Sequence, residues 1–203
     1  MMMTMMQWLK PGARAMARLL LAACATSALA GPVADRVQSQ SVLRVCVWPD
    51  YYGVTFRHPR TQQLGGIDID LSGELARDLK ARVEYVDSSF PTLIDDLNQD
   101  RCDVAMFAIG MLPQRMEKLA FTQPYMRSDI YGITTKTNTV IKQWADIDKP
   151  GVLVGVQAGT FMEPIMAQRL KQATLVRIQL PATRERELTA GRIDVFMTDY
   201  PYS

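Results

Sequence analysis

The sequence predicts an α/β protein with two doubly wound lobes. Short apolar runs and amphipathic segments follow one another in the order strand, helix, strand, helix, strand over residues 42–109, and a similar order restarts near residue 131. This alternation is typical of mainly parallel sheets that are covered by helices on both faces. We expect a first lobe over residues 41–128 and an incomplete second lobe over residues 129–203.

Strands are expected where apolar, often β-branched residues run together between turn formers. The first lobe has three such runs, at residues 42–47, 83–86 and 103–109. The second lobe has four, at residues 131–135, 152–156, 174–180 and 193–197. The turn-rich residues 57–66 predict a hairpin or a loose loop between the first two strands.

The expected helices are indicated by their first residues and their apolar stripes. Asp70 is the expected N-cap of the first helix, which has an apolar stripe of leucines along one face. Phe90-Pro91 opens the second helix, because proline suits the first helical turn. In the second lobe, helices are expected at residues 144–147, 161–172 and 182–190.

The first 30 residues have the pattern of an export signal. Lys10, Arg14 and Arg18 precede an apolar run at residues 19–29, which ends in small residues that suit cleavage after Ala30. The run is shorter than the roughly 20 residues that cross a bilayer. A lipoprotein box ending at Cys24 is the second-ranked interpretation, because Arg18 leaves almost no apolar run before it. Either way we expect an exported, periplasmic protein.

Removal of this leader changes the charge balance of the chain. The leader contains three cations and no acids, so the formal net charge falls from +2 to −1, and 173 residues remain. The basic balance therefore belongs to the leader, and nothing in the rest of the chain argues for nucleic acid binding. A chain of this length can bury a core as one domain or as two small ones.

Two cysteines remain after the leader, and each lies in an apolar, strand-like run. An oxidising compartment permits a disulfide between Cys46 and Cys102. The alternative, which we favour, is a pair of buried free thiols that pack as small hydrophobic side chains. No zinc site is expected, because the chain has no C-x-x-C motif and its single histidine, His58, lies in a polar loop.

The most informative segment is Ala108-Ile-Gly-Met-Leu-Pro-Gln-Arg115. An apolar strand runs into a turn, and Arg115 follows on the expected first turn of a helix. A planar, bidentate cation beside free backbone amides suits a small carboxylate, whereas most single arginines on helices are simply solvated. No comparably strong acid–base or metal constellation accompanies it. The segment therefore favours capture of a small anionic or zwitterionic molecule over chemistry on it.

Other candidate residues lie where predicted strands end, which is where doubly wound sheets bind ligands. Trp48, Tyr51 and Phe90 follow two strands of the first lobe and suit the lining of a cleft at least as well as a core. In the second lobe, Thr160 stands at a helix N-terminus, where amides and a hydroxyl can meet an anion, and it also suits an N-cap. Asp199 ends the last strand.

Two further features have structural interpretations. Asp68 and Asp70 look like paired catalytic carboxylates, but a helix cap and a structural loop contact are the better interpretation. The chain stops soon after Asp199, with neither a capping helix nor a strand leading back to the first lobe, and this predicts a truncated chain.

In these residues the chain resembles the type II periplasmic solute-binding proteins of the amino-acid-binding kind (bacterial extracellular solute-binding protein family 3), which serve ATP-driven importers. The resemblance covers roughly residues 41–200, and its pieces are weak singly but specific as an ordered set. The pieces are the leader, Leu43-Arg-Val45, Gly66-Ile-Asp-Ile-Asp-Leu71, Arg101-Cys-Asp-Val-Ala-Met106, the Arg115 turn, residues 121–125, residues 155–160, Gly191-Arg-Ile-Asp194 and Asp199.

The resemblance implies a role for each candidate residue. Arg115 would pair with the α-carboxylate of the ligand, assisted by Gly110 and Thr160, and Asp199 would receive the α-ammonium group. Around Ala108 and Gly110 many relatives have hydroxyl side chains, whereas this chain offers only backbone. The residues expected to flank the ligand side chain are Trp48, Tyr51 and Phe90.

The implied mechanism is capture of an amino acid, or a related zwitterion, in a cleft between two lobes that close about a hinge. The expected partner is the membrane permease of an ABC importer, and the expected form is a monomer without a cofactor. Two alternatives stay open. One is an exported cyclohexadienyl dehydratase, which the chain resembles at residues 90–95; it would need a general acid for prephenate or arogenate, with Glu163 or Asp199 as candidates. The other is the ligand-binding sensor module of a receptor.

Overall fold

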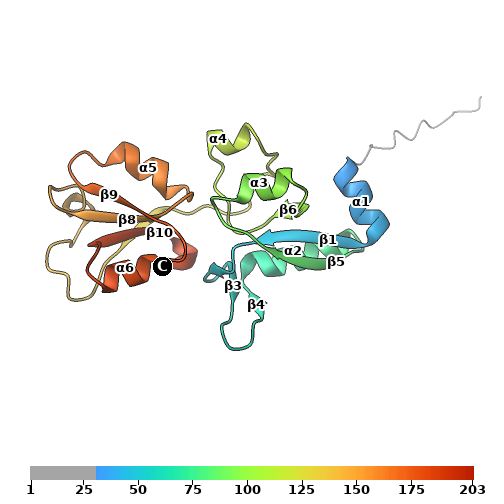
Figure 1. Ribbon diagram of the computed structural model, residues 1–203, viewed down its shortest axis with the longest axis horizontal. Coiled ribbons are helices and arrows are strands. Elements are labelled where there is room, and N and C mark those ends of the chain that lie inside the picture. The colour runs from blue at the N-terminus through green and yellow to red at the C-terminus, as the bar shows by residue number, and fades with distance from the viewer. Residues whose placement is uncertain (1–30) are drawn as a thin grey trace, which may run out of the picture. The chain divides into compact units, whose positions relative to one another are not determined.

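The computed structural model describes residues 31–203, and the predicted export signal at residues 1–30 lies outside this range (Figure 1). Within the described range, no helix is both long and apolar enough to cross a membrane. The elements of the first half are α1 (Pro32–Gln40), β1 (Val42–Val47), β2 (Asp50–Tyr51), β3 (Thr55–Arg57), β4 (Leu64–Gly65), α2 (Ile67–Asp78), β5 (Arg82–Asp87), α3 (Leu93–Asn98), β6 (Val104–Ala105) and α4 (Pro113–Met116). Those of the second half are β7 (Ile130–Ile133), η1 (Trp144–Asp146), β8 (Leu153–Gln157), α5 (Met162–Arg169), β9 (Thr174–Ile178), α6 (Arg184–Thr189), β10 (Val195–Asp199) and η2 (Tyr200–Tyr202).

The first sheet has the strand order β5-β1-β6, and all of its pairs are parallel. Side chains of β1 alternate between its two faces, as the period of a strand requires. Val45 and Val47 pack with Ala76 of α2, whereas Cys46 packs with Leu93 of α3 on the opposite face. The sheet is therefore covered on both faces, and its strand ends lead into the loops at residues 48–54 and 88–92.

The second sheet has the order β7-β10-β8-β9, in which only β7 runs antiparallel to its neighbour. Met197 of β10 packs with Met162 and Met166 of α5, whereas the adjacent Phe196 packs with Leu188 of α6. Both faces are again covered, so the observed architecture agrees with the doubly wound prediction. The turn-rich segment forms a small antiparallel sheet in the order β2-β3-β4.

The prediction that Asp70 caps the first helix is wrong. Helix α2 begins at Ile67, and the carbonyl of Gly66 accepts from the backbone N–H of Asp70, so Asp70 lies inside the first turn. Of the expected leucine stripe, Leu75 and Leu79 do pack against the core. Leu71 is 39% exposed, whereas Asp68, Ser72 and Ala76 are buried.

The strand expected at residues 103–109 is also shorter than predicted. Only Val104 and Ala105 pair with β1, whose own strand ends at Val47. At Ala108 the backbone adopts a positive φ of 50°, which breaks the extended conformation. The apolar residues beyond β6 instead join the core, where Phe107 is fully buried.

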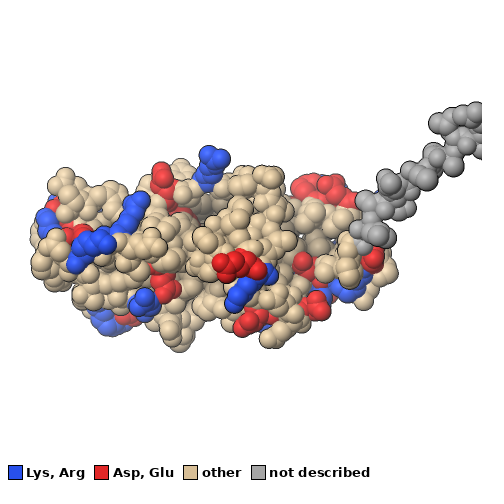
Figure 2. All heavy atoms as spheres, turned by 90° about the horizontal axis from the view of Figure 1, so that it is seen from above, with Lys and Arg blue, Asp and Glu red and all other residues tan. Residues whose placement is uncertain are grey.

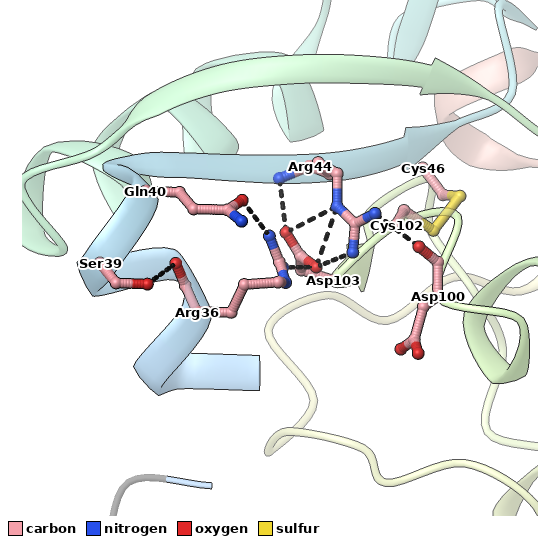
Figure 3. Close-up of polar contacts among 8 residues, drawn as sticks. All are labelled: Arg36, Ser39, Gln40, Arg44, Cys46, Asp100, Cys102 and Asp103. Atoms are coloured by element: carbon pink, nitrogen blue, oxygen red, sulfur yellow. Dashed lines mark hydrogen bonds and ion pairs between the residues drawn. A yellow bond between two sulfur atoms is a disulfide. The ribbon is translucent and has the colours of Figure 1, made fainter. Parts of the chain in front are cut away.

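Cys46 and Cys102 form a disulfide, so the favoured interpretation of free thiols is wrong. Their Cα atoms are 5.6 Å apart, because Cys102 lies just before β6, the strand that pairs with β1. Figure 3 shows the polar contacts of Asp103, which follows Cys102 in the chain. The carboxylate of Asp103 accepts from the backbone N–H of Arg44 at 2.8 Å and from its guanidinium at 2.7 Å, and it also pairs with Arg36 of α1. The crosslink and the ion pairs together fix β6 and α1 to β1.

Charged side chains of both signs are interspersed on the face shown in Figure 2. Many of the exposed charges are paired at close range, including Arg177 with Glu163 and Arg192 with Glu187, each at 2.6 Å. Exposed pairs of this kind contribute about 0–1 kcal/mol each. The surface charges therefore affect solubility more than they affect the fold.

We predict that replacing Cys46 and Cys102 together by alanine lowers the free energy of unfolding by about 4 kcal/mol. The two residues are 56 positions apart, and a crosslink over such a loop removes conformational freedom from the unfolded chain. Urea denaturation of the oxidised protein and of the double variant measures the difference. A reductant should destabilise the natural sequence and leave the double variant unchanged; equal sensitivity of the two proteins would contradict the prediction.

Candidate functional site

Arg115 lies in α4 with its guanidinium turned into the protein, where the side chain is 4% exposed. Nη1 donates to the carbonyl of Gly110 at 2.8 Å, and Nη2 donates to the carbonyl of Gly159 at 2.6 Å. The guanidinium carbon lies 5.6 Å from the ring centre of Phe90. Burial lowers the pKa of Arg115 to about 10, so the group stays charged at neutral pH. Among residues 31–203, none of the ion pairs involves Arg115.

The hydrogen bond between Arg115 and Gly159 joins the two halves of the chain, and it can form because residue 159 is a glycine. Its φ is +77°, and a Cβ atom here would lie 2.9 Å from the backbone nitrogen of Pro91. A side chain would therefore push the loop after β8 away from the loop after β5. Without one, the carbonyl of Gly159 reaches the guanidinium of Arg115.

Asp199 ends β10 and is 3% exposed. The hydroxyl of Tyr51 donates to its Oδ2, whereas Oδ1 meets no hydrogen-bond donor among the described residues. Burial raises the pKa of Asp199, against the opposing effects of the Tyr51 hydroxyl and of the positive charge of Arg184. The pKa of Tyr51 is also raised, first by burial and then by the charge of Asp199. This carboxylate therefore has an unused acceptor oxygen in a water-poor environment.

The three aromatic candidates form one buried cluster. The ring centres of Trp48 and Phe90 are 5.3 Å apart, those of Trp48 and Tyr51 are 5.4 Å apart, and those of Tyr51 and Phe90 are 6.0 Å apart. With Thr160 and Asp199 they line a cavity of about 10 Å³, which has room for about one water molecule. These three side chains therefore pack in the core and also line the cavity, so both of the roles considered for them apply.

A larger hollow of about 710 Å³ lies beside the segment that connects the two halves. Ala108, Gly110 and Asp199 line it together with residues 121–129. Its size would suit a small molecule, but the buried Arg115 does not line it. Asp199 lines both this hollow and the small cavity, whereas Arg115 lines neither.

Several donors that the sequence suggested for an anion are engaged within the chain. The backbone N–H of Ala108 donates to Asp68 at 2.7 Å, and that of Gly159 donates to Glu163 at 2.8 Å. The hydroxyl of Thr160 donates to the carbonyl of Gln157 at 2.7 Å. A ligand would have to compete for each of these donors.

The interpretation of Asp68 as a structural loop contact is confirmed. Its fully buried carboxylate accepts from the backbone N–H of Ala108 and from the hydroxyl of Tyr125, both near 2.8 Å. Burial raises the pKa of Asp68, whereas both donors act in the opposite direction. Asp68 thereby holds the positive-φ turn at Ala108 that leads to Arg115.

Arg184 is a site residue that the sequence did not indicate. It lies in α6, is 3% exposed and lines the small cavity with Asp199. Its Nη1 donates to the carbonyl of Met197 at 2.9 Å, and its guanidinium carbon lies 4.3 Å from the ring centre of Tyr202. In the charged run at residues 184–187, nothing distinguishes Arg184 from the exposed Arg186. Only the packing of α6 against β10 does so.

A family model of bacterial extracellular solute-binding proteins, family 3, matches residues 43–174. The chain belongs to this family. It is 32% identical over 189 residues to cyclohexadienyl dehydratase of Pseudomonas aeruginosa, covering 92% of this chain and 69% of that protein. It is 30% identical over 125 residues to a probable amino-acid ABC transporter-binding protein of Haemophilus influenzae, covering 62% of this chain and 48% of that protein. The chain therefore spans about half to two thirds of the length of these two relatives.

Solved structures agree with the fold. The ancestral amino acid-binding protein AncCDT-1, a precursor of cyclohexadienyl dehydratase, gives a TM-score of 0.76 at 32% identity, covering 82% of this chain and 73% of that one. The arginine-bound form of truncated ArgBP from T. maritima gives 0.73 at 26% identity, covering 83% and 78%. The expected family and its two-lobe α/β fold are thus confirmed.

Proposed function

We propose that this chain is the ligand-binding part of an exported solute-binding protein that captures a small amino acid, or a related zwitterion, for an ABC importer. The observation that carries the proposal is the buried guanidinium of Arg115, whose hydrogen bonds go to carbonyls of both halves of the chain. A carboxylate would replace these neutral acceptors with charge-assisted, bidentate hydrogen bonds. The proposed lobes are residues 41–128 and 129–203, and the proposed leader is residues 1–30.

The roles assigned to the other site residues follow from their chemistry. Asp199, with its unused Oδ1, receives the α-ammonium group. Gly110 and Thr160 lie beside the carboxylate position through their contacts with Arg115 and with the loop after β8. Ala108 contributes backbone, held in place by Asp68. The side chain of the ligand meets Trp48, Tyr51 and Phe90.

Capture requires the two halves to separate and close again. A cavity of about 10 Å³ cannot hold an amino acid. The contacts that must exchange for ligand contacts are those of Tyr51 with Asp199 and of Arg115 with Gly159, each of which joins the first half to the second. Closure then desolvates the ligand charges, so both must find partners in the protein.

The names of relatives support the cellular role. Similar proteins include the probable amino-acid ABC transporter-binding protein of Haemophilus influenzae and the L-cystine-binding protein TcyJ of Escherichia coli. On this basis the protein acts in the periplasm as a monomer and delivers its ligand to a membrane permease.

Similarity to cyclohexadienyl dehydratase favours a second candidate function, elimination on the same fold. Of the two acids nominated for it, Glu163 is engaged by the backbone N–H of Gly159 and by Arg177 at 2.6 Å, and it does not line the small cavity. Asp199 remains, because burial raises its pKa and so favours a protonated carboxyl. Release of phenylpyruvate from prephenate by the purified protein would replace the transport function with this one.

We predict that Arg115→Ala weakens ligand binding by at least about 100-fold, because it leaves the ligand carboxylate buried without its charged partner. Arg115→Lys should weaken binding less, because it keeps the charge but loses the bidentate geometry. A thermal-shift screen against the common amino acids identifies the ligand, and titration calorimetry then measures the affinities. The exposed Arg60→Ala is the matched control and should bind normally. Unchanged affinity in Arg115→Ala would refute the site.

We predict that ligand affinity rises with pH and then becomes constant. Burial raises the pKa of Asp199 in the free protein, and a bound ammonium group favours the ionised carboxylate and so lowers this pKa in the complex. Affinity therefore increases between the two pKa values and is flat above the higher one. Calorimetry from pH about 4 to about 8 measures the profile, with Asp199→Asn as the comparison. The variant should bind weakly and lose this pH dependence; a profile identical to that of the natural protein would contradict the assignment.

A further inference from the structure

One aromatic residue of the second half lines three neighbouring hollows, and the proposed function does not use it. Phe161 follows Thr160 directly and is the N-cap residue of α5. It lines the small cavity, the large hollow and a third hollow beside Trp144. Among the described residues, only Phe161 and Asp199 line both the small cavity and the large hollow. Phe161 therefore belongs to the wall between these two spaces.

Phe161 lies against the turn that holds Arg115, which belongs to the other half of the chain. A Cβ atom on Gly110 would lie 3.0 Å from the Cβ atom of Phe161 and 3.3 Å from its Cγ atom. The carbonyl of the same glycine accepts from Nη1 of Arg115 at 2.8 Å. Position 110 therefore has no room for a side chain, and Phe161 packs directly on its backbone.

We propose that Phe161 seals the ligand cavity against solvent on the side of the large hollow when the two halves are together. This inference rests on the proposed function and adds a residue to its site. The ring reaches from the second half onto the backbone of Gly110 in the first half, so the seal forms only when the halves meet. The charges of a bound ligand then face Arg115 and Asp199 without competition from water.

A seal at this place matters because the site is expected to pair buried charges. Asp199 lines both spaces that Phe161 separates, yet it is only 3% exposed, and its Oδ1 meets no donor among residues 31–203. An ion pair in a water-poor cavity is stronger than one in contact with solvent, because the effective dielectric constant is lower. It is also screened much less by salt. Solvent that reached Asp199 from the large hollow would therefore weaken its pairing with an ammonium group.

A simpler role for Phe161 is packing within its own half. The side chain does pack against the core cluster that includes Met162 and Met166. In that role alone, its removal would lower the free energy of unfolding. It would not change the access of solvent to Trp48, a cavity residue of the other half, or the salt dependence of binding. These two measurements therefore separate a seal from ordinary core packing.

The first test needs no ligand. The chain without its leader has two tryptophans, so Trp144→Phe leaves Trp48 as the sole emitter of tryptophan fluorescence. Trp48 is 6% exposed and lines the small cavity. We expect acrylamide to quench its fluorescence more strongly when Phe161→Ala is added to this background. Phe121→Ala, the same change at a residue that lines the large hollow but not the small cavity, should leave the quenching unchanged.

The second test is titration calorimetry with those common L-amino acids that bind the natural protein. It is run at about 0.01 M and about 1 M sodium chloride, where the screening length falls from about 30 Å to about 3 Å. We expect Phe161→Ala to bind at least about tenfold more weakly than the natural protein, as truncation of a buried aromatic contact does. Its affinity should also fall more steeply with salt, because solvent reaches the ligand charges.

A variant on the opposite side of the contact tests the same seal independently. Gly110→Ala introduces a methyl group against Phe161 and displaces its ring, and it adds no backbone strain because the φ of Gly110 is not positive. We expect the same changes in affinity and in salt dependence as in Phe161→Ala, but smaller. Gly73→Ala is the matched control, because a Cβ atom there meets nothing within 4 Å.

Each outcome bears on a different statement. Unchanged quenching of Trp48 in Phe161→Ala, or an unchanged salt dependence of its affinity, overturns the seal and leaves the transport function intact. A Gly110→Ala variant that behaves like Gly73→Ala overturns the contribution of the turn. If no amino acid binds while the quenching rises, the proposed function fails and the seal of the cavity is supported. Thermal melting checks that each variant folds, and should Phe161→Ala not fold, Phe161→Leu and Gly110→Ala decide.

Discussion

The hydrogen bonds of one buried guanidinium connect the two halves of this protein. Arg115 reaches the carbonyl of Gly110 in its own half and the carbonyl of Gly159 in the other. A buried donor without an acceptor is costly, so this side chain stays buried only while both loops hold their positions. The carbonyls satisfy its hydrogen bonds but cannot neutralise its charge. The guanidinium is therefore held by neutral acceptors, and its positive charge is left for an anion to neutralise.

The topology explains why such different segments meet at this place. In the first sheet the parallel strands β1 and β5 end toward the loops that carry Tyr51 and Phe90, and in the second sheet β10 ends at Asp199. Helices on both faces of each sheet leave these strand ends as the accessible backbone. Asp68 then fixes the turn at Ala108, and the disulfide fixes the start of β6 to β1. The site is therefore built from loops, but rigid strands and a covalent link position them.

Sequence periodicity predicted the strands and most helices, because burial on two faces leaves a local signature. Where local and tertiary effects compete, the sequence was a poorer guide. The helix at Asp70 begins earlier because Gly66 turns the chain against Val54, and β6 is short because its neighbour β1 ends. Nothing local to Cys46 or Cys102 encodes their proximity, which results from strand order. Arg184 escaped notice for the same reason, since its burial depends on β10 and Tyr202, which lie outside its own charged run.

Fold and ligand charge are set by different residues in this protein. The strands, the glycine at position 159 and the loop contact of Asp68 shape the cleft and leave its charge undetermined. That charge comes from a few buried side chains, and a position such as 184 can change it without altering the sheets. Buried cations also discriminate by penalty, since a ligand of the wrong charge leaves them without a partner or adds repulsion. Similarity to an arginine-bound structure therefore supports the architecture, while the ligand class has to be judged from the buried charged groups, which include Arg115, Arg184, Asp199 and the buried Oε1 of Glu185.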